Sequence, residues 1–411
     1  MIYWMSESRL YYSTIEGDRK LQNRDVEMTS NPLIYLDNAA TTPCDPRVIE
    51  EMKPYWVTYY GNPSSPHLLG QHARQIVERC RKDIKDALNG SGTIIFTSSS
   101  TESNNIAVFS LMRYSLEELK RRKILCLSVE HKSVINAITS YGRQLGIEIE
   151  WIPVTKNGII DFKWFYSKLN SSVGAVIVQL ANSETGIIQD IQQIAEACRN
   201  VKALLFSDIT QAIGKIKVDL DKLGVDYASF SAHKFYGPKG IGALYIAPSR
   251  KITPMMFGGG QEKGIRPGTE NVPGIVGLTS ALRLCVEELE QNTRHLAKLR
   301  ERLWEHLKVA GEIRWNGWGV DLLPSHLNVT IRHVNAQELM LRMREVAFSA
   351  GSACNTASNE PSYVLTNMGL SKKEAEETIR LTVGKFNTPK EIDLAGRILV
   401  NAIKEIRSEK L

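Results

Sequence analysis

Short apolar runs rich in β-branched residues recur along the first half of the chain, and longer amphipathic stretches separate them. The runs lie at residues 93–96 (TIIF), 124–129 (ILCLSV), 174–181 (GAVIVQLA), 203–207 (ALLFS) and 227–230 (YASF). Because nearly every position in these runs is apolar, we expect strands buried on both faces of a sheet. The stretches between them, such as 191–199 (IQQIAEACR), are long enough for crossover helices. The pattern predicts an α/β fold with a mostly parallel sheet.

The connection after the run at 227–230 is too short to hold a crossover helix. Only SAHKFYGPKGI separates this run from the next one, GALYI at 242–246, and glycine and proline interrupt the link. Parallel neighbours need a crossover of a dozen or more residues, whereas antiparallel neighbours do not. We therefore expect the strand at 242–246 to run antiparallel to the strand before it.

The second half of the chain changes character and predicts a smaller α+β domain. Its expected elements are a long helix at 278–309, a strand at 326–331, a helix near 336–344, a short run at 346–349, a strand at 379–383 and a C-terminal helix. For the last helix, Thr388 is the expected N-cap, Pro389 occupies the first turn and Glu391 completes a capping box.

The predicted division places a large α/β domain at residues 45–285. Residues 33–44 and 286–411 together form the predicted small α+β domain. Residues 1–32 mix acidic and basic side chains and lack the apolar core of a signal peptide, and their acids argue against a transit peptide. We interpret this stretch as a loosely ordered N-terminal extension.

Composition argues against several classes of protein. The 411 residues carry a net charge of +6, but lysines and arginines are scattered among acids. This distribution does not indicate a basic patch that binds nucleic acid. No apolar run approaches the roughly 18 residues of a membrane span. The six cysteines form no C-x-x-C pair, so we expect no disulfide framework and no metal site. Free thiols indicate a reducing compartment, and we expect the cytoplasm.

Polar residues follow five of the predicted strands at the point where each strand ends. The stretches are TSSSTE after 93–96, EHK after 124–129, NSETG after 174–181, Asp208 after 203–207 and SAHK after 227–230. In parallel α/β sheets, ligands bind outside the carboxyl ends of the strands. The sequence therefore predicts an active site at this edge of the sheet.

Lys234 is the most informative of these residues. Most lysines are simply exposed, but this one follows a buried strand and has Ser231 and His233 beside it. A lysine in a partly desolvated pocket can attack a carbonyl and form a Schiff base. In this kind of fold the usual carbonyl belongs to pyridoxal 5′-phosphate (PLP), which also needs an acid at its ring nitrogen and a phosphate cradle.

Three further features fit such a site, although each has a simpler explanation. Asp208 could keep the ring nitrogen protonated, or it could cap a turn. The hydroxyl-rich turn FTSSSTESNN could hold a phosphate at a helix N-terminus, or it could only cap that helix. His131 could stack on the ring and shuttle protons, or it could be a satisfied polar residue.

The combination of motifs resembles the NifS/IscS branch of the cysteine desulfurases, which are class V aminotransferase-like PLP enzymes of fold type I. The motifs occur in the order YLDNAATTPCDPRV, YYGNPSSPH, FTSSSTESNN, EHKSV, ANSETG, SDITQAIGK, SFSAHKFYGPKGIGALY, GGGQEKGIRPGTEN, AGSACNTASNEPSYVL and IRLTVGKF. The resemblance covers roughly residues 33–410. It implies a large domain with a mostly parallel seven-stranded sheet.

The resemblance also implies roles for individual residues. Lys234 would form the Schiff base, Asp208 would face the pyridine nitrogen, Gln211 would face the ring hydroxyl, and His131 would stack on the ring and move protons. The phosphate would be bound by Thr101, Ser231 and His233, with the backbone N–H of Ser100. The substrate carboxylate would be held by Asn38, Asn182 and Arg380, with Asn182 also near the cofactor. Thr269, in RPGTEN, would reach the phosphate of a neighbouring subunit, which implies a homodimer with shared sites.

Cys354 would decide the reaction. It lies in FSAGSACNTASNEPS, where small and polar residues predict a mobile loop, although composition alone is equally compatible with an incidental cysteine. By resemblance it attacks the sulfur of L-cysteine, leaves L-alanine, and passes a persulfide to an iron–sulfur scaffold or a tRNA-thiolation protein. No resident metal is implied, although Cys354 could ligate a cluster during transfer.

Three alternatives to a cysteine desulfurase remain open. A class V aminotransferase would use Lys234 and Asp208 but not Cys354, and a selenocysteine lyase would use the same chemistry on selenium. The third is a scaffold that relays sulfur without turnover. The intact set of Lys234, Asp208, His131 and Arg380 argues against that scaffold.

Overall fold

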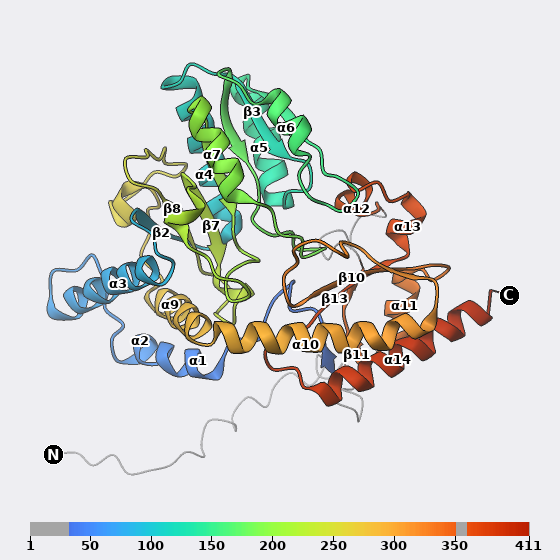
Figure 1. Cartoon of the computed structure of the whole chain (residues 1–411). Coiled ribbons are helices and arrows are strands. Elements are labelled where there is room, and N and C mark those ends of the chain that lie inside the picture. The colour runs from blue at the N-terminus through green and yellow to red at the C-terminus, as the bar shows by residue number, and fades with distance from the viewer. Residues whose placement is uncertain (1–32, 351–359, 411) are drawn as a thin grey trace, which may run out of the picture.

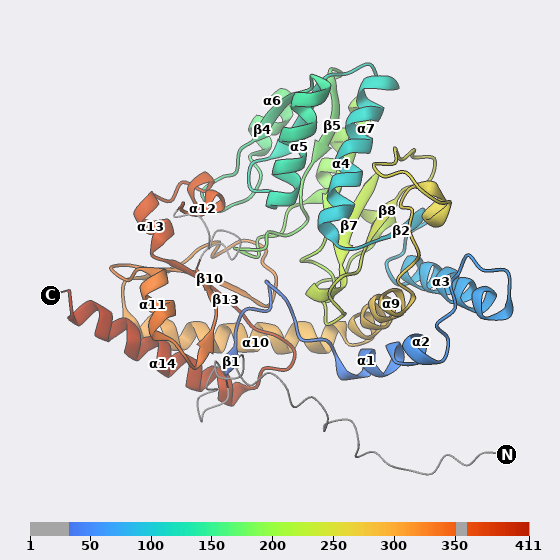
Figure 2. The same cartoon turned by 180° about the vertical axis from the view of Figure 1, so that it is seen from behind.

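The computed structural model of the chain describes residues 33–350 and 360–410 (Figure 1). The predicted extension at 1–32 lies outside the described residues. Two sheets with their helices lie above and beside one long helix, α10 (Leu289–Leu307), which runs along the base of the molecule in Figures 1 and 2. Helix α14 (Pro389–Ser408) packs beside it.

The first half of the chain forms the predicted mostly parallel sheet, and it has seven strands. In order across the sheet they are β2 (Thr93–Thr97), β8 (Gly242–Ile246), β7 (Tyr227–Ser231), β6 (Leu204–Asp208), β5 (Val173–Ile177), β3 (Lys123–Leu127) and β4 (Glu148–Ile152). Strand β8 pairs antiparallel with both of its neighbours, which confirms the prediction made from its short connection. The remaining pairs are parallel.

Helices cover both faces of this sheet. One face carries α4 (Ser100–Glu117) and α5 (Lys132–Leu145). The other carries α3 (Leu68–Ala87), α6 (Phe162–Lys168), α7 (Ile191–Val201), α8 (Leu220–Leu223) and α9 (Val272–Glu287) (Figures 1 and 2). Along β5, Ile177 points into the core under α4 and α5, whereas Val176 points into the opposite one. Burial on both faces explains why apolar residues occupy nearly every position of these strands.

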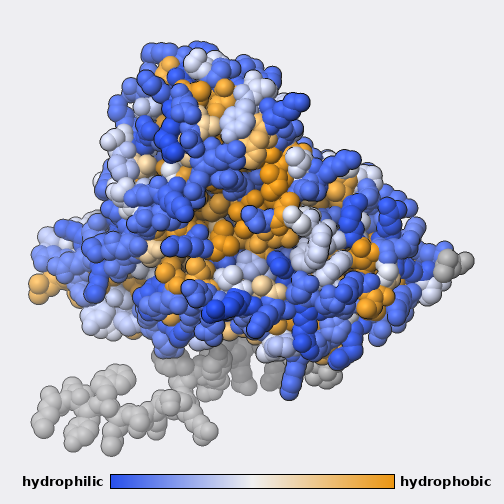
Figure 3. Space-filling model, viewed as in Figure 1, coloured by the Kyte–Doolittle hydropathy of each residue, from blue (hydrophilic) through white to orange (hydrophobic). Residues whose placement is uncertain are grey.

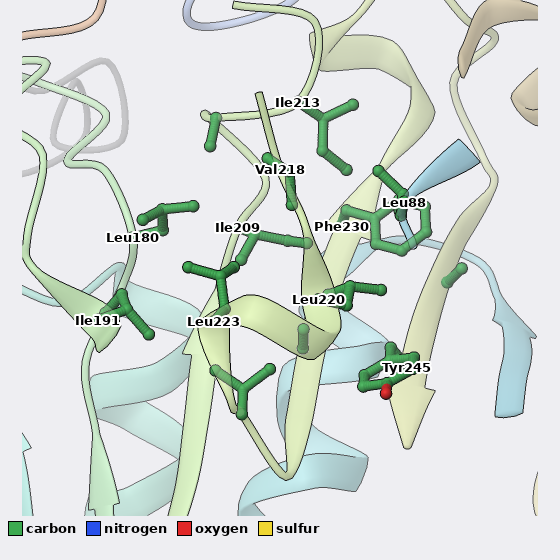
Figure 4. Packing of buried hydrophobic residues seen from close by; sticks show 14 of the residues in the cluster. Leu88, Leu180, Ile191, Ile209, Ile213, Val218, Leu220, Leu223, Phe230 and Tyr245 are labelled. Carbon is green, nitrogen blue, oxygen red and sulfur yellow. The ribbon is translucent and has the colours of Figure 1, made fainter. Parts of the chain in front are cut away.

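The core on the α8 side shows how the chain after β6 is fixed. Figure 4 shows Ile209, Val218 and Leu223 packed with Phe230 of β7 and Tyr245 of β8. All five side chains are at most 8% exposed. Burial of a side chain of this size stabilises a fold by about 1.5–3 kcal/mol, so the segment that follows Asp208 is held firmly.

The second half builds a separate sheet around its own core. Its antiparallel strands are, in order, β12 (Ser349–Ala350), β13 (Thr378–Thr382), β10 (His326–Ile331) and β9 (Ile313–Trp315). Strand β1 (Ile34–Tyr35) pairs with β11 (Val346–Ala347) beside this sheet. Helices α10, α11 (Ala336–Arg342) and α14 pack against it and share its apolar cluster. The predicted capping box at Thr388 is confirmed, with the Thr388 and Glu391 side chains each bonded to the other's backbone N–H.

The single helix predicted at 278–309 is wrong, because α9 ends at Glu287 and α10 begins at Leu289. Glu288 lies between them with φ −96° and ψ 5°, and its carboxylate binds Arg47 at 2.6 Å. Apolar residues continue through the break because α9 packs into the first core and α10 into the second. Periodicity alone could not reveal a change of core.

Two further features qualify the sequence-based division. The edge strand β4 was not among the apolar runs, because its solvent-facing positions carry charged residues such as Glu148 and Glu150, as is common for edge strands. Helices α12 (Tyr363–Asn367) and α13 (Lys372–Glu376) belong to the second half but contribute Val364 and Ala375 to the first core. The division at residue 285 stays a prediction.

Among the described helices, none combines the length and apolar character needed to cross a bilayer.

Candidate active site

Residues that follow five strands of the large sheet line one cavity of about 150 Å³. Six of the predicted site residues line it, namely Ser100, His131, Asp208, Gln211, Lys234 and Arg380. The second sheet also contributes to the lining, with Arg380 from β13. Apolar residues gather on the face between the large sheet and α10 in Figure 3. The predicted convergence of polar groups at this sheet edge is confirmed.

Lys234 ends a short turn of 3-10 helix (Ala232–Lys234) directly after β7. Its Nζ donates to the backbone carbonyl of Ala39 at 2.8 Å and to that of Ala40 at 2.5 Å. The amine is thus held at the cavity by the segment that follows β1. Lys239, five residues later in the same motif, is exposed.

Asp208 and Gln211 lie deeper in the same cavity. Asp208 Oδ1 accepts the backbone N–H of Thr210 at 2.9 Å, and its Oδ2 accepts the Asn104 side-chain amide at 2.9 Å. Gln211 Nε2 donates to the Ala39 carbonyl at 3.0 Å. Gln211 Oε1 is buried and has no hydrogen-bond partner within the described part of the chain. An acceptor is therefore left available at the cavity.

His131 caps α5 and faces the charges of the cavity. Its Nδ1 accepts the backbone N–H of Ser133 at 3.2 Å and lies 2.7 Å from Ser133 Oγ. Burial lowers the pKa of His131; the Asp208 charge opposes this change, and the Lys234 charge adds to it. The imidazole is therefore neutral near pH 7, which suits proton transfer rather than anion binding.

Arg380 is buried and lies between the two halves of the molecule. Its guanidinium binds Asp37 at 2.6 Å and Ser349 Oγ at 3.1 Å through Nη2, and the Ser183 carbonyl at 3.1 Å through Nη1. Its Nε is buried without a partner among the described residues. Only 3% of Arg380 is exposed, so its ion pair with Asp37 is not a surface salt bridge.

Comparisons with known proteins agree with this geometry. The family model for Aminotransferase class-V matches residues 34–394. The cysteine desulfurase IscS 1 of Archaeoglobus fulgidus is 39% identical over 378 residues, which are 91% of this chain and 98% of that protein. The cysteine desulfurase IscS of Rickettsia prowazekii is 40% identical over 380 residues, with shares of 91% and 92%. The chain belongs to the class V aminotransferases, in their cysteine desulfurase branch.

Solved structures support the same placement. A NifS-like protein matches this chain with a TM-score of 0.83 and 34% identity, over 92% of this chain and 99% of that one. A structure described as SspA in complex with cysteine matches with a TM-score of 0.75 and 31% identity, over 86% and 100% of the two chains. The mostly parallel sheet is therefore that of the PLP-dependent fold type I.

The cavity residues fit PLP, the cofactor of class V aminotransferases. The unpartnered Gln211 Oε1 can bind the ring hydroxyl, and Asp208 can bind the ring nitrogen. The phosphate end would lie at the N-terminus of α4, where first-turn N–H groups have no partner within the helix. Lys234 supplies the amine for a Schiff base.

A glycine allows the turn before α4, where the phosphate of PLP would bind, to lie close to the large sheet. A Cβ at Gly242 would lie 2.6 Å from the carbonyl carbon of Ser99 and 2.8 Å from the carbonyl oxygen of Phe230. Both contacts are closer than a side chain tolerates. The close approach of the turn before α4 to strand β8 therefore requires glycine at this position.

Gly242→Ala is expected to weaken PLP binding by about tenfold or more, because overpacking of this kind costs about 1–3 kcal/mol at the turn that would bind the phosphate. Fluorescence titration of the cofactor-free protein with PLP measures the change. Gly260→Ala is the matched control, since a Cβ there meets nothing within 4 Å. Equal PLP affinity of the Gly242→Ala variant and the wild type would contradict the proposed phosphate position.

Several predicted site residues do not line the cavity, and their roles stay predictions. Asn182 is buried with both ends of its amide used, Nδ2 on the Val129 carbonyl and Oδ1 on the backbone of Glu184 and Thr185. Asn38 donates to the Thr382 carbonyl at 2.9 Å. In this arrangement both amides hold the backbone around the site.

The predicted phosphate ligands are also spread around the cavity rather than lining it, Ser100 excepted. Ser231 is buried and its hydroxyl donates to the Ile241 carbonyl at 3.3 Å. Burial lowers the pKa of His233 to about 4, and its Nδ1 lies 3.1 Å from Thr41 Oγ1. Thr101 and Thr269 are exposed in the single chain.

Cys354 lies outside the described residues, but the residues on both sides of its segment lie against the site. Before it, Ser349 Oγ donates to Asp37 Oδ1 at 2.9 Å and accepts from Arg380. After it, Ser362 Oγ donates to the Glu184 carboxylate at 2.5 Å. Ser349 and Ser362, which are described, thus lie beside groups that line or support the cavity.

Sequence reasoning missed Glu184 and Asn104. Both lie in motifs that were identified, NSETG and FTSSSTESNN, but nothing in one sequence indicates which residue of a motif faces the cavity. Glu184 lines it directly. Burial raises the pKa of Glu184 to about 7, while the hydrogen bond from Ser362 and the Arg380 charge oppose that change.

Glu184→Gln is expected to gain stability relative to the wild type as the pH rises. The folded protein holds the Glu184 proton up to about pH 7, whereas the unfolded chain releases it near the ordinary glutamate pKa of 4.5. Ionisation therefore lowers the free energy of unfolding of the wild type progressively above pH 4.5, and glutamine avoids this loss. From pH 5 to pH 8 the difference should grow by about 2 kcal/mol.

Denaturant unfolding of both proteins across this pH range measures the difference. Glu196→Gln, at an exposed carboxylate, is the matched control and should show no such trend. A difference between Glu184→Gln and the wild type that is independent of pH would contradict the raised pKa.

In residues 33–350 and 360–410, no three histidine, cysteine or acidic side chains lie close enough together to hold a metal ion.

Proposed function

We propose that this protein is a PLP-dependent cysteine desulfurase that converts L-cysteine to L-alanine and carries the sulfur as a persulfide on Cys354. The observation that carries the proposal is the single cavity in which Lys234, Asp208 and Arg380 converge. It lies in a chain that matches cysteine desulfurases over 91% of its length.

Arg380 is the residue suited to bind the substrate carboxylate. A guanidinium carries a positive charge and several N–H donors that suit a carboxylate, and the Nε of Arg380 has no partner in the described part of the chain. Asp37 and Ser349 hold Nη2 in place. The arginine is thereby oriented before substrate arrives, which reduces the entropy lost on binding.

Lys234 and His131 are the residues suited to move protons. When bound, PLP supplies an electron sink that stabilises negative charge at the substrate α-carbon. The Lys234 amine would remove the proton from that carbon, since the backbone carbonyls of Ala39 and Ala40 hold it at the cavity. The neutral His131 would accept a proton from an approaching thiol, because only a thiolate is a good nucleophile.

Cys354 would carry the sulfur. Its thiolate attacks the substrate sulfur, an S–S bond forms as the Cβ–S bond breaks, and the electron pair left on Cβ takes up a proton to give alanine. The substrate carbon is reduced and the sulfur is oxidised to the persulfide level, so no further oxidant is needed.

The other five thiols do not suit this role. None of them lines the cavity, and burial raises the pKa of every one. They are Cys44, Cys80, Cys126, Cys198 and Cys285, all free of disulfides. Cys354 is four residues beyond Ala350, so covalent geometry allows its Cα to lie up to about 13 Å from the strand beside Arg380.

The test is release of alanine and sulfide from L-cysteine in the presence of a reductant. The wild type should release both, and Cys354→Ala should release neither while keeping the visible absorption of bound PLP. Cys44→Ala, at the half-buried thiol, is the matched control and should behave as the wild type. If the wild type transaminates another amino acid and leaves cysteine intact, the cofactor assignment stands and the desulfurase reaction fails. Faster release from selenocysteine would favour the lyase alternative.

A homodimer with Thr269 at the neighbouring site would explain why several large apolar side chains are exposed. They are Trp56, Val57, Tyr60, Leu68 and Phe257, which are 64–92% exposed. The loop after β8 that carries Thr269 is fixed by two ion pairs, Glu262 with the buried Arg81 at 2.8 Å and Arg266 with Glu102 at 2.9 Å. Such anchoring would present Thr269 in a defined place to a second subunit.

Light scattering after gel filtration is expected to give twice the 46.1 kDa chain mass. Val57→Asp combined with Tyr60→Asp should give the single-chain mass, because charge is costly in an apolar interface. Val309→Asp changes an exposed apolar side chain that is not in this set, and it should leave the dimer intact. A wild type that runs at the single-chain mass would contradict the dimer.

The sulfur acceptor and the compartment are two further proposals. We propose an iron–sulfur scaffold or a tRNA-thiolation protein as acceptor, as the resemblance to the NifS/IscS branch implies. Transfer of radioactive sulfur from L-[35S]cysteine to a purified acceptor of either kind tests this, and transfer to neither contradicts it. The cytoplasmic location rests on the cysteine spacing and stays a prediction.

A further inference from the structure

Asn104 lies at the centre of a hydrogen-bonded network under the cavity. It is a fully buried residue of α4. Its Nδ2 donates to Asp208 Oδ2 at 2.9 Å and to Ser133 Oγ at 2.8 Å, and its Oδ1 accepts from Ser229 Oγ. One side chain therefore joins helix α4 to β6, β7 and the start of α5.

The chemistry of the partners fixes the orientation of this amide. An ionised carboxylate only accepts hydrogen bonds, so Asp208 requires the NH₂ group of Asn104 on its side. The carbonyl oxygen then faces Ser229, whose hydroxyl can donate. A flipped amide would place its oxygen against the Asp208 carboxylate and lose both donated bonds.

The same orientation determines the tautomer of His131. Because Ser133 Oγ accepts from Asn104, its single O–H is free to donate to His131 Nδ1, which lies 2.7 Å away. The backbone N–H of Ser133 donates to the same nitrogen at 3.2 Å. Nδ1 is thus an acceptor, and the neutral imidazole carries its proton on Nε2.

We propose that Asn104 is a positioning residue that couples Asp208 to His131. By donating to both sides, it holds the carboxylate that would bind the ring nitrogen of PLP and keeps His131 in the Nε2–H form. The inference rests on the proposed function, because Asp208 and His131 act on the cofactor and substrate only if PLP occupies the cavity.

The pH dependence of this network involves the other charges that face it. Three charges act on His131. They are those of Asp208 at the end of β6, Lys234 in the turn after β7 and Lys132 in its own helix. The buried carboxyl of Glu130 faces Asp208. These groups are common to all the variants below, so differences between pH profiles report the network itself.

Two variants of the PLP-loaded enzyme distinguish the two branches of the network. One branch is the bond from Asn104 to Asp208, and the other runs from Asn104 through Ser133 to His131. Asn104→Leu removes both donated bonds, so PLP release should be about tenfold faster and the pH midpoint of its visible absorption band should shift by about one unit. Ser133→Ala breaks only the His131 branch, so the absorption band should titrate as in the wild type while the pH profile of kcat/KM changes. Ser133→Thr keeps the hydroxyl and should restore the wild-type profile. Asn105→Leu, one residue further along α4, is the matched control.

The outcomes distinguish this inference from the proposed function. If the wild type binds no PLP or releases no alanine from cysteine, the proposed function itself fails. If the wild type does both and Asn104→Leu, folded as judged by circular dichroism, retains the wild-type release rate and midpoint, the coupling is overturned. The same holds if Ser133→Ala and Ser133→Thr give identical pH profiles.

Discussion

Replacement of Lys234 by alanine is expected to remove covalent attachment of PLP and to lower the rate of alanine formation by about 10³-fold or more. The Lys234 amine lines the cavity and would form the Schiff base with the cofactor, and it is also the proposed base at the substrate α-carbon. Treatment of the wild type with borohydride, followed by peptide mapping, should find PLP fixed to the Lys234 peptide. The variant should bind PLP only reversibly.

Lys239→Ala is the matched control for this experiment. Lys239 belongs to the same motif but is exposed and does not line the cavity. Its loss should leave both attachment and rate unchanged. Cofactor fixed to a lysine other than Lys234 in the wild type would refute the assignment of the cavity.

Arg380→Lys is expected to lower kcat/KM for L-cysteine by about 100-fold, mostly through a higher KM. Lysine keeps the charge that pairs with Asp37 but loses the planar pair of N–H groups that match a carboxylate. Because the charge is retained, the half-buried Asp37 carboxylate should keep a partner and the fold should survive. Steady-state kinetics with cysteine measures the effect.

The control for Arg380 is Arg314→Lys. Arg314 pairs with Glu374 at 3.2 Å on the surface, so this change should leave KM unaltered. If Arg380→Lys instead lowered kcat with KM unchanged, Arg380 would act in the transition state and not in binding the carboxylate.

The sheet and its functional edge could be predicted from the sequence because burial leaves a strong signal. Strands β2, β3, β5, β6 and β7 are apolar at nearly every position, and the polar residues that follow them have little reason to be there unless they serve the site. The antiparallel strand β8 followed from the length of one link. These features depend on local sequence and on general rules of sheet topology.

What could not be predicted depends on which residues meet in space. The break at Glu288 is set by the change from one core to the other, and the apolar pattern does not register that change. The network of Asn104 joins residues separated by 29 to 125 positions. Asn182 was expected to bind substrate, yet its amide is engaged by the backbone of its own turn and by Val129.

The central claim is that Cys354 takes sulfur from L-cysteine, and mass spectrometry of the peptide that contains it tests this most directly. After one equivalent of L-cysteine without reductant, the account predicts one additional sulfur atom on the Cys354 peptide, equal in amount to the alanine formed. Alanine formed with the additional sulfur on another cysteine, or on none, would contradict the account.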